Sequence, residues 1–308
     1  MKYKDYLNVW LENYVFNFLK ERTFKRYEVS VRLYISPFLG GFKLDEITPA
    51  ILQKFVNELS VNGSKSRGGG LSKNSINSIV TVIKNSLKTA YRQGFIKTDP
   101  AETLIRPKRE EKKIECFSTK EQALIEKAIL SGKKDKMLGV IVCLYTGLRI
   151  GELLALSPSS VDFDKRLLTV SRSCHDSPSG LKIDTPKTKN SARVIPLPKQ
   201  LITILKTLKR TSNADFLITD NGKTLSVRSY QRSFELLLKK LNIPHRGFHS
   251  LRHTFATRAL ECGMDVRTLS EILGHKNPTV TLNRYAHSLL EHKTAMMNRL
   301  AKSFFPVH

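Results

Sequence analysis

The sequence has few cysteines and no long apolar run. Its four cysteines are scattered among 308 residues and form no Cys-x-x-Cys pair. No signal-peptide pattern opens the sequence, and the longest apolar stretch, around residues 137–148, is too short to cross a bilayer. We therefore expect a reduced, cytoplasmic protein with no membrane partner.

Motifs for bound cofactors are also lacking. The sequence has no glycine-rich phosphate loop and no carboxylate cluster suited to Mg²⁺. No internal repeat is evident. The sequence therefore predicts no cofactor.

Acidic residues are about half as frequent as basic ones. The 52 Lys and Arg residues outnumber the 27 Asp and Glu residues, so the formal net charge is +25. Residues 1–110 hold 19 basic and 10 acidic side chains, and the remainder holds 33 and 17. Because both parts are basic, we expect a polyanion, most simply nucleic acid, to be wrapped by the chain. Solubility or contact with an anionic membrane is the alternative explanation of the charge.

The first 95 residues predict four helices. Apolar side chains recur at helical spacing within residues 7–19, 27–38, 51–59 and 76–87. Thr48 and Ser72 precede the third and fourth stretches as N-caps, and Gly94 ends the fourth. The glycine-rich loop 62–70 carries Lys65 and Arg67, which either contact DNA phosphates or belong to a plain loop.

The rest of the chain predicts a mixed domain. Two prolines and a charged run mark residues 98–114 as a linker, either a hinge or a solvated connector. Ser118 to Glu121 resembles a capping box that begins a new helix. Extended runs at 167–172, 181–186 and 193–197 predict a small antiparallel sheet, and helices return from about Pro198. The predicted fold is mainly α-helical with a small antiparallel β-sheet, in domains 1–97 and 115–308.

Two arginines are candidates for gripping a phosphate. A guanidinium forms paired hydrogen bonds with phosphate oxygens, and two fixed ones stabilise the charge that builds up at phosphorus. Arg149 lies in an apolar segment, where an unpaired charge is costly, and Glu152 is placed to orient it. The second candidate is Arg252.

Proton carriers and a nucleophile follow along the chain. His249 lies three residues before Arg252, on the same helical face, and His275 follows a glycine at a helix end. Tyr285 is the candidate nucleophile, and its phenol, with a pKa near 10, needs neighbouring positive charge to ionise. A lysine can protonate the leaving 5′ oxygen. Lys187 is the candidate, with Lys189 as the alternative.

A metal site is the alternative role for the histidines. His245, His249 and His253 recur every four residues, which is a spacing that zinc can use. Pro244 and Gly247, however, indicate that His245 precedes the helix, and no acidic residue lies between His249 and His253. We therefore predict no metal ligand.

Four of these segments resemble motifs of the tyrosine recombinase (phage integrase) family. They are Thr-Gly-Leu-Arg-Ile-Gly-Glu at 146–152, His-Ser-Leu-Arg at 249–252, Leu-Gly-His at 273–275 and Arg-Tyr-Ala-His at 284–287. The resemblance implies a helical core-binding (SAM-like) domain at 1–97 and a catalytic domain at 115–308. It also implies a 3′-phosphotyrosine intermediate and an active site composed of Arg149, Lys187, His249, Arg252, His275 and the nucleophile Tyr285.

The implied function is site-specific DNA recombination, for the integration or excision of a phage or mobile element. The implied partners are duplex DNA, copies of the chain in a tetramer, and a directionality factor. Residues 286–308, which contain Leu289, Leu290, Met296, Met297 and Leu300, are expected to form a helix exchanged between protomers. Because the predicted helices begin near Met1, we expect binding at the core site only. A relaxing topoisomerase and a DNA-binding protein without catalysis are the alternative functions.

Overall fold

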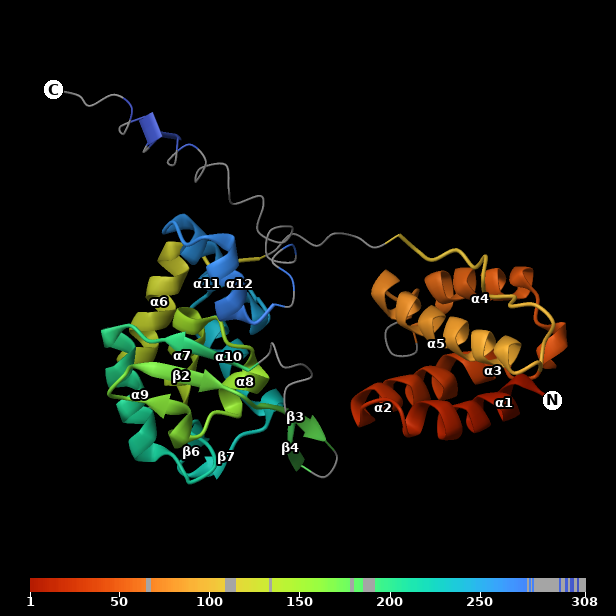
Figure 1. Cartoon of the computed structure of the whole chain (residues 1–308), viewed down its shortest axis with the longest axis horizontal. Coiled ribbons are helices and arrows are strands. Elements are labelled where there is room, and N and C mark those ends of the chain that lie inside the picture. Colours follow the sequence, from red (N-terminus) through yellow and green to blue (C-terminus); the bar gives the residue numbers. More distant parts are fainter. Residues whose placement is uncertain are drawn as a thin grey trace. The chain divides into compact units, whose positions relative to one another are not determined.

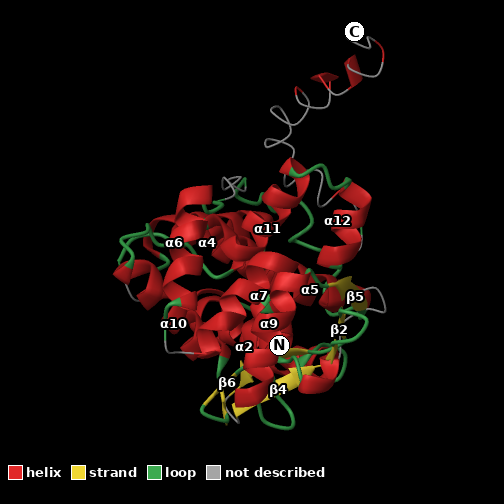
Figure 2. Cartoon of the chain, turned by 90° about the vertical axis from the view of Figure 1, so that its left-hand side faces the viewer, coloured by secondary structure: helices red, strands yellow, loops and turns green. Residues whose placement is uncertain are grey.

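The computed structural model describes most of the chain. The described residues are 1–64, 68–108, 115–132, 135–177, 180–184 and 192–275, with 277, 279, 294, 297, 298, 300, 301 and 304 near the C-terminus. The chain divides into two compact units, an N-terminal unit Met1–Lys112 and a C-terminal unit Lys113–His308. Helices make up most of the structure and strands are few, which confirms the predicted fold class (Figures 1 and 2).

The N-terminal unit consists of helices, as its apolar periodicity predicts. The four predicted stretches form helices, although the first ends at Phe16 rather than at residue 19, and two of them contain π-helical turns. The elements are α1 (Tyr3–Trp10) continuing as η1 (Leu11–Phe16), α2 (Glu21–Ser30) continuing as η2 (Val31–Ile35) and α3 (Ser36–Leu39), the short η3 (Leu44–Glu46), α4 (Pro49–Asn62) and α5 (Lys73–Arg92).

Local caps and a buried polar contact fix these helices. The predicted N-caps are confirmed, because Thr48 Oγ1 accepts a hydrogen bond from the N–H of the third helical residue of α4 at 3.3 Å, and Ser72 Oγ does the same for α5 at 3.2 Å. The first and last helices meet at Ser86, whose Oγ lies 2.7 Å from Tyr3 Oη. Ala101 and Leu104, within the segment predicted as a linker, are buried in the core of this unit.

The C-terminal unit is built around one apolar helix. α7 (Leu138–Thr146) is buried along nearly its whole length and packs against α6, α9 and α11 (Figure 1). The predicted capping box at Ser118 and Glu121 is confirmed and begins α6. The helical elements are α6 (Thr119–Leu130), η4 (Asp135–Met137), α7, α8 (Ile150–Leu154), η5 (Pro158–Ser160), α9 (Lys199–Thr211), α10 (Val227–Lys240), α11 (His249–Glu261) and α12 (Val266–Leu273).

Among the described residues of this unit, the strands form three small antiparallel groups rather than one sheet. β1 (Val161–Asp162), β2 (Leu167–Val170) and β5 (Arg193–Pro196) pair in the order β1-β2-β5. β3 (Ser173–Ser177) and β4 (Gly180–Asp184) form a separate hairpin, and so do β6 (Thr219–Asp220) and β7 (Lys223–Thr224). The expectation that the run at 181–186 joins the other two in one sheet is wrong, because its described part pairs with β3.

Among the described residues, no helix combines the length and the apolar character needed to cross a membrane. The four cysteines are all free thiols.

Candidate active site

Arg149 lies at the turn between α7 and α8. α7 ends at Thr146, and Gly147 follows with a φ of 65°, in the left-handed region. A Cβ atom at Gly147 would lie 2.5 Å from Phe255 Cδ1 and 2.7 Å from Leu273 Cδ2, so only glycine fits this turn without displacement. The turn delivers Arg149 to the N-cap position of α8.

Glu152 orients Arg149, as the sequence predicts. The main-chain N–H of Arg149 donates to Glu152 Oε2 at 2.9 Å, and Arg149 Nη1 donates to Glu152 Oε1 at 2.8 Å. The side chain of Glu152 is 7% exposed, whereas that of Arg149 is 40% exposed. The guanidinium of Arg149 is therefore anchored on one side and accessible to an anion on the other.

A second guanidinium, which the sequence analysis did not single out, also binds Glu152. Arg193 Nη2 lies 2.9 Å from Glu152 Oε2, and Arg193 Nη1 lies 3.2 Å from Oε1. Burial raises the pKa of the Glu152 carboxyl, but the hydrogen bond and charge of Arg193, followed by the charge of Arg149, outweigh it and lower the pKa to about 2. Glu152 is therefore ionised at neutral pH.

Arg252 is buried and held by main-chain carbonyl groups. Its residue is 1% exposed. Nη1 donates to the Gly147 carbonyl oxygen at 2.8 Å, and Nη2 donates to the Leu273 carbonyl oxygen at 2.7 Å. Since Gly147 lies two residues before Arg149, Arg252 is tied to the same turn that presents the other candidate arginine.

His275 contacts Arg252 directly. α12 ends at Gly274, which has a φ of 65°, and the main-chain N–H of His275 then donates to the Ser270 carbonyl oxygen at 3.0 Å. This turn brings His275 Nε2 to 2.8 Å from Arg252 Nη2. The structure thus confirms the predicted position of His275 at a helix end and brings two candidate residues together.

His249 shares a helix with Arg252. It is the first residue of α11, exposed to solvent, and lies three residues before Arg252, on the same side of the helix. Its ring meets that of His253 edge to face, with centroids 4.7 Å apart. The α11 helix therefore presents a buried cation and an exposed imidazole one turn apart.

Several predicted residues lie outside the described part of the chain. The nucleophile and the candidate lysines are among them, as are the two candidate DNA contacts of the N-terminal unit and most of the apolar residues of the expected exchange helix. They are Tyr285, Lys187, Lys189, Lys65, Arg67, Leu289, Leu290 and Met296.

Of the three histidines that the metal alternative requires, His249 and His253 lie on α11 and His245 lies outside it. α11 begins at His249, so His245 precedes the helix as predicted. His245 Nε2 instead lies 3.6 Å from Glu235 Oε1, and its side chain is 72% exposed. Within the described ranges, no group of three or more His, Cys, Asp or Glu side chains is arranged to hold a metal ion.

The position of Arg193 in its strand could have identified it as a residue with a buried partner. It stands two residues before Ile195, which is 2% exposed, so the alternation of a strand places both on the inner face. A charged residue on the core side of a strand requires a buried counter-charge. That requirement points to a carboxylate, and Glu152 provides it.

This arrangement is suited to phosphoryl transfer on a nucleic acid strand. One accessible and one buried guanidinium are fixed by the same turn, and an imidazole lies against the second of them. Fixed positive charge of this kind stabilises the extra negative charge of a phosphorane-like transition state. The fold and the site thus define a nucleic-acid phosphoryl-transfer enzyme.

The chain belongs to the phage integrase family, whose members are the tyrosine recombinases. The family's model matches residues 116–292, and a model described as the N-terminal SAM-like domain of phage integrases matches residues 2–60. The function and the enzyme class predicted from the sequence, a site-specific tyrosine recombinase, are thereby confirmed.

Similar proteins and solved structures agree with this family assignment. A XerC-like tyrosine recombinase of Caldanaerobacter subterraneus is 31% identical over 97% of this chain and 83% of its own length. The transposase of transposon Tn916 from Enterococcus faecalis is 30% identical over 86% and 69%. The Tn1549 transposon integrase, solved with transposon right end DNA, superposes with a TM-score of 0.81 at 26% identity and covers 98% of this chain and 100% of that one.

Proposed function

We propose that this chain recombines duplex DNA at specific sites for a mobile element, with Tyr285 as the nucleophile. The observation that carries the proposal is the fixation of Arg252 by Gly147, Leu273 and His275, which holds a buried cation beside the turn of Arg149. The relatives add a biological setting, because two of them are named as a transposase and a transposon integrase.

The proposed reaction exchanges one phosphodiester for another. The Tyr285 phenolate attacks phosphorus, a bond forms between its oxygen and the 3′ phosphate, and the bond to the 5′ oxygen breaks. Arg149 and Arg252 hold the non-bridging oxygens while charge builds up there. His249 and His275 accept and donate protons at the site, including the proton that the Tyr285 phenol loses, and Lys187 donates a proton to the leaving 5′ oxygen. A second 5′ hydroxyl reverses the steps and reseals the strand.

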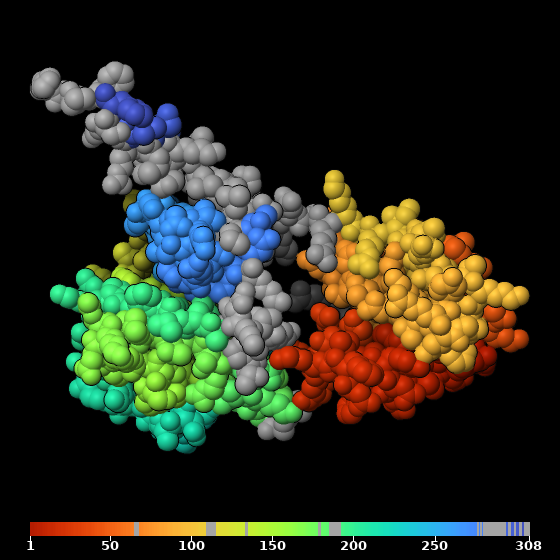
Figure 3. Space-filling model, in the orientation of Figure 1, coloured from red at the N-terminus to blue at the C-terminus, as the bar shows by residue number. Residues whose placement is uncertain are grey.

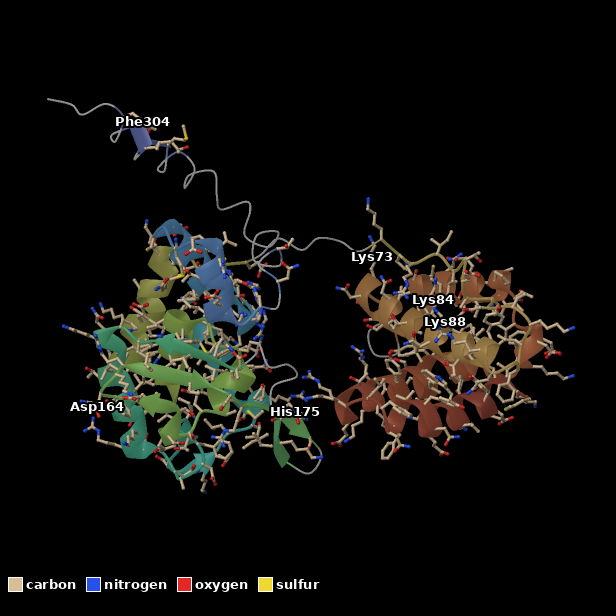
Figure 4. All side chains as sticks on the ribbon, in the orientation of Figure 1. Lys73, Lys84, Lys88, Asp164, His175 and Phe304 are labelled. Atoms are coloured by element: carbon tan, nitrogen blue, oxygen red, sulfur yellow. The ribbon has the colours of Figure 1, made fainter. Side chains whose placement is uncertain are left out.

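Basic side chains on α5 support DNA contact by the N-terminal unit. Lys84 and Lys88 lie along this helix (Figure 4), with Arg92 four residues further on. Arg106 joins these three around a cavity of about 510 Å³. Asp99 and Glu102 also line this cavity, so the basic residues outnumber the acidic ones. We propose that these side chains contact DNA phosphates, which are the groups that position a protein on a duplex.

Assembly on DNA belongs to the same proposal. Three apolar side chains near the C-terminus are exposed: Met297, Leu300 and Phe304. We propose that this segment docks on a neighbouring copy and couples four protomers on DNA, and that a directionality factor is a further partner. The free state of all four cysteines is in keeping with a reduced cytoplasm.

Trapping of a covalent complex tests the proposal. The recombination site is first identified by sequencing the DNA junctions that form in cells expressing the chain. A duplex with this site and a nick is then used, so that cleavage cannot reverse. We expect a denaturation-resistant protein–DNA complex with the wild type and with Tyr14→Phe, which removes an exposed phenol from the N-terminal unit. Tyr285→Phe should form none.

Other outcomes identify the alternatives. A Tyr285→Phe protein that still forms the complex would exclude this nucleophile. A wild type that shifts the duplex on a gel without cleaving it would be a binding protein only. Relaxation of plasmids without any site preference would indicate a topoisomerase.

A further inference from the structure

We propose that Arg193 is a positioning residue that sets the orientation of Arg149 through Glu152. It also ties this pair to the turn that carries His275. The inference rests on the proposed function, because it requires Arg149 to act on the scissile phosphate.

Glu152 lies between two guanidiniums that bind it in different ways. Arg193 approaches with both Nη atoms, at 2.9 Å from Oε2 and 3.2 Å from Oε1, which is a two-pronged geometry. Arg149 approaches with Nη1 alone, at 2.8 Å from Oε1. The two-pronged contact fixes the plane of the carboxylate, and the plane of the carboxylate then fixes the direction in which Arg149 points.

Burial assigns a different role to each arginine. The side chain of Arg193 is 6% exposed, and that of Glu152 is 7% exposed, so these two form a buried ion pair. The side chain of Arg149 is 40% exposed. Arg193 therefore serves as the permanent counter-charge of Glu152, and Arg149 remains accessible to a phosphate. Without Arg193, Arg149 becomes the sole counter-charge of a buried carboxylate and is drawn away from the substrate.

Arg193 also supports the end of α12. Its Nε donates to the carbonyl oxygen of Ile272 at 2.5 Å. A Cβ atom at Gly274 would lie 3.0 Å from Arg193 Nη1, so the guanidinium packs directly under the glycine that precedes His275. Figure 3 shows the blue surface of the α12 region lying against the green part of the same unit. One side chain thus joins the Arg149 pair to the His275 turn.

Double-mutant kinetics distinguish positioning from mere structural support. If Arg193 acts through Arg149, its removal is costly only while Arg149 is present to be misplaced. In an Arg149→Lys background, Arg193→Met should then cost much less cleavage rate than in the wild type, and the smaller loss that remains measures its contact at the end of α12. A purely structural role predicts the same factor in both backgrounds.

The experiment measures single-turnover cleavage and DNA affinity for these variants, with a thermal melt for each. We expect Arg193→Met to slow cleavage about 100-fold, as for a catalytic group displaced by about 1 Å, while DNA affinity stays close to that of the wild type. Arg193→Lys keeps the positive charge but cannot form the paired hydrogen bonds to Glu152, so it should recover only part of the cleavage rate. Lys136→Gln breaks an ion pair with Asp220 in the same unit, away from Arg149, and should cleave normally.

Each result supports or overturns the inference. A folded Arg193→Met that cleaves at the wild-type rate, or losses that multiply independently of Arg149, would overturn it. If Arg193→Met does not fold, the same cycle is run with Arg193→Lys. A wild type that forms no Tyr285 complex would refute the proposed function itself, a result distinct from either of these.

Discussion

At the scale of single residues, Arg252 and Arg193, two arginines whose side chains are largely buried, differ in what holds them. Arg193 is bound by a carboxylate, which cancels its charge. Arg252 donates hydrogen bonds to the carbonyl oxygens of Gly147 and Leu273, which are neutral dipoles. This difference suits Arg193 to support the site and Arg252 to meet an anionic substrate.

The Glu152 carboxyl predicts a specific dependence of stability on pH. Its pKa falls from 4.5 to about 2 on folding, because the contacts of the two arginines outweigh burial. A depressed pKa contributes stability that is complete above pH 4.5 and is lost as the pH falls toward 2. This shift corresponds to a contribution on the order of 3 kcal/mol.

Urea denaturation of the wild type and Glu152→Gln between pH 6 and 2 measures this contribution. We expect the wild type to be more stable at pH 6 and the two unfolding free energies to converge as the pH falls through the window of about 4.5 to 2. Curves that stay parallel over that window would show that Glu152 does not titrate with a depressed pKa.

The sequence located most candidate residues but not their contacts. Apolar surroundings and a carboxylate three positions away were enough to predict the pairing of Arg149 with Glu152, because that contact is local. The contacts of Arg252 with Gly147 and Leu273 join residues 105 and 21 positions away. Such contacts depend on the packing of α11 against α7 and α12, which no local pattern encodes.

At the scale of elements, the turn between α7 and α8 makes two demands on Gly147. Its φ of 65° disfavours any side chain, and its Cβ position is filled by Phe255 and Leu273. Gly263, which follows α11, has a φ of 88° but open space around it. Substitutions at the two glycines therefore distinguish the free-energy cost of the backbone conformation from the free-energy cost of steric crowding.

Gly147→Ala should lower the free energy of unfolding by about 1–3 kcal/mol more than Gly263→Ala, because overpacking adds to the conformational cost. It should also slow cleavage, since the Gly147 carbonyl holds Arg252. Chemical denaturation and the covalent-complex assay measure the two effects. Equal destabilisation by both substitutions would mean that the α7–α8 turn relaxes around an added methyl group.

Helices were easier to predict than strands in this chain. The helices carry caps and long apolar stripes, and α4, α5 and α6 begin where Thr48, Ser72 and Ser118 place them. The missed strands lack a pattern of their own: β1, β6 and β7 have two residues each, and β3 reads Ser-Cys-His-Asp-Ser. Their pairing comes from turn geometry and from neighbouring strands, so hydrophobic alternation gave no signal.

At the scale of the whole molecule, both units contain a buried apolar core and an excess of basic side chains. The N-terminal unit has one buried apolar cluster that includes α5, and the C-terminal unit has a large one that includes α7 and a smaller one on α11 and α12. Each unit is also strongly basic. Because both units are basic, each can attract a polyanion, and the net charge of +25 provides long-range attraction.

The location of charge, rather than its total, should govern the salt dependence of DNA binding. Lys84→Gln/Lys88→Gln removes two positive charges from α5 (Figure 4). Lys199→Gln/Lys206→Gln removes two exposed ones from α9, so both double variants have the same net charge. If the α5 lysines contact phosphates, their loss should reduce the slope of log affinity against log salt by about 2, because each contact releases a counterion. The α9 variant should keep the wild-type slope. Gel-shift titrations at several salt concentrations measure these slopes. Equal reductions of the slope in both variants would indicate that the total charge, and not a phosphate-binding surface on α5, attracts the DNA.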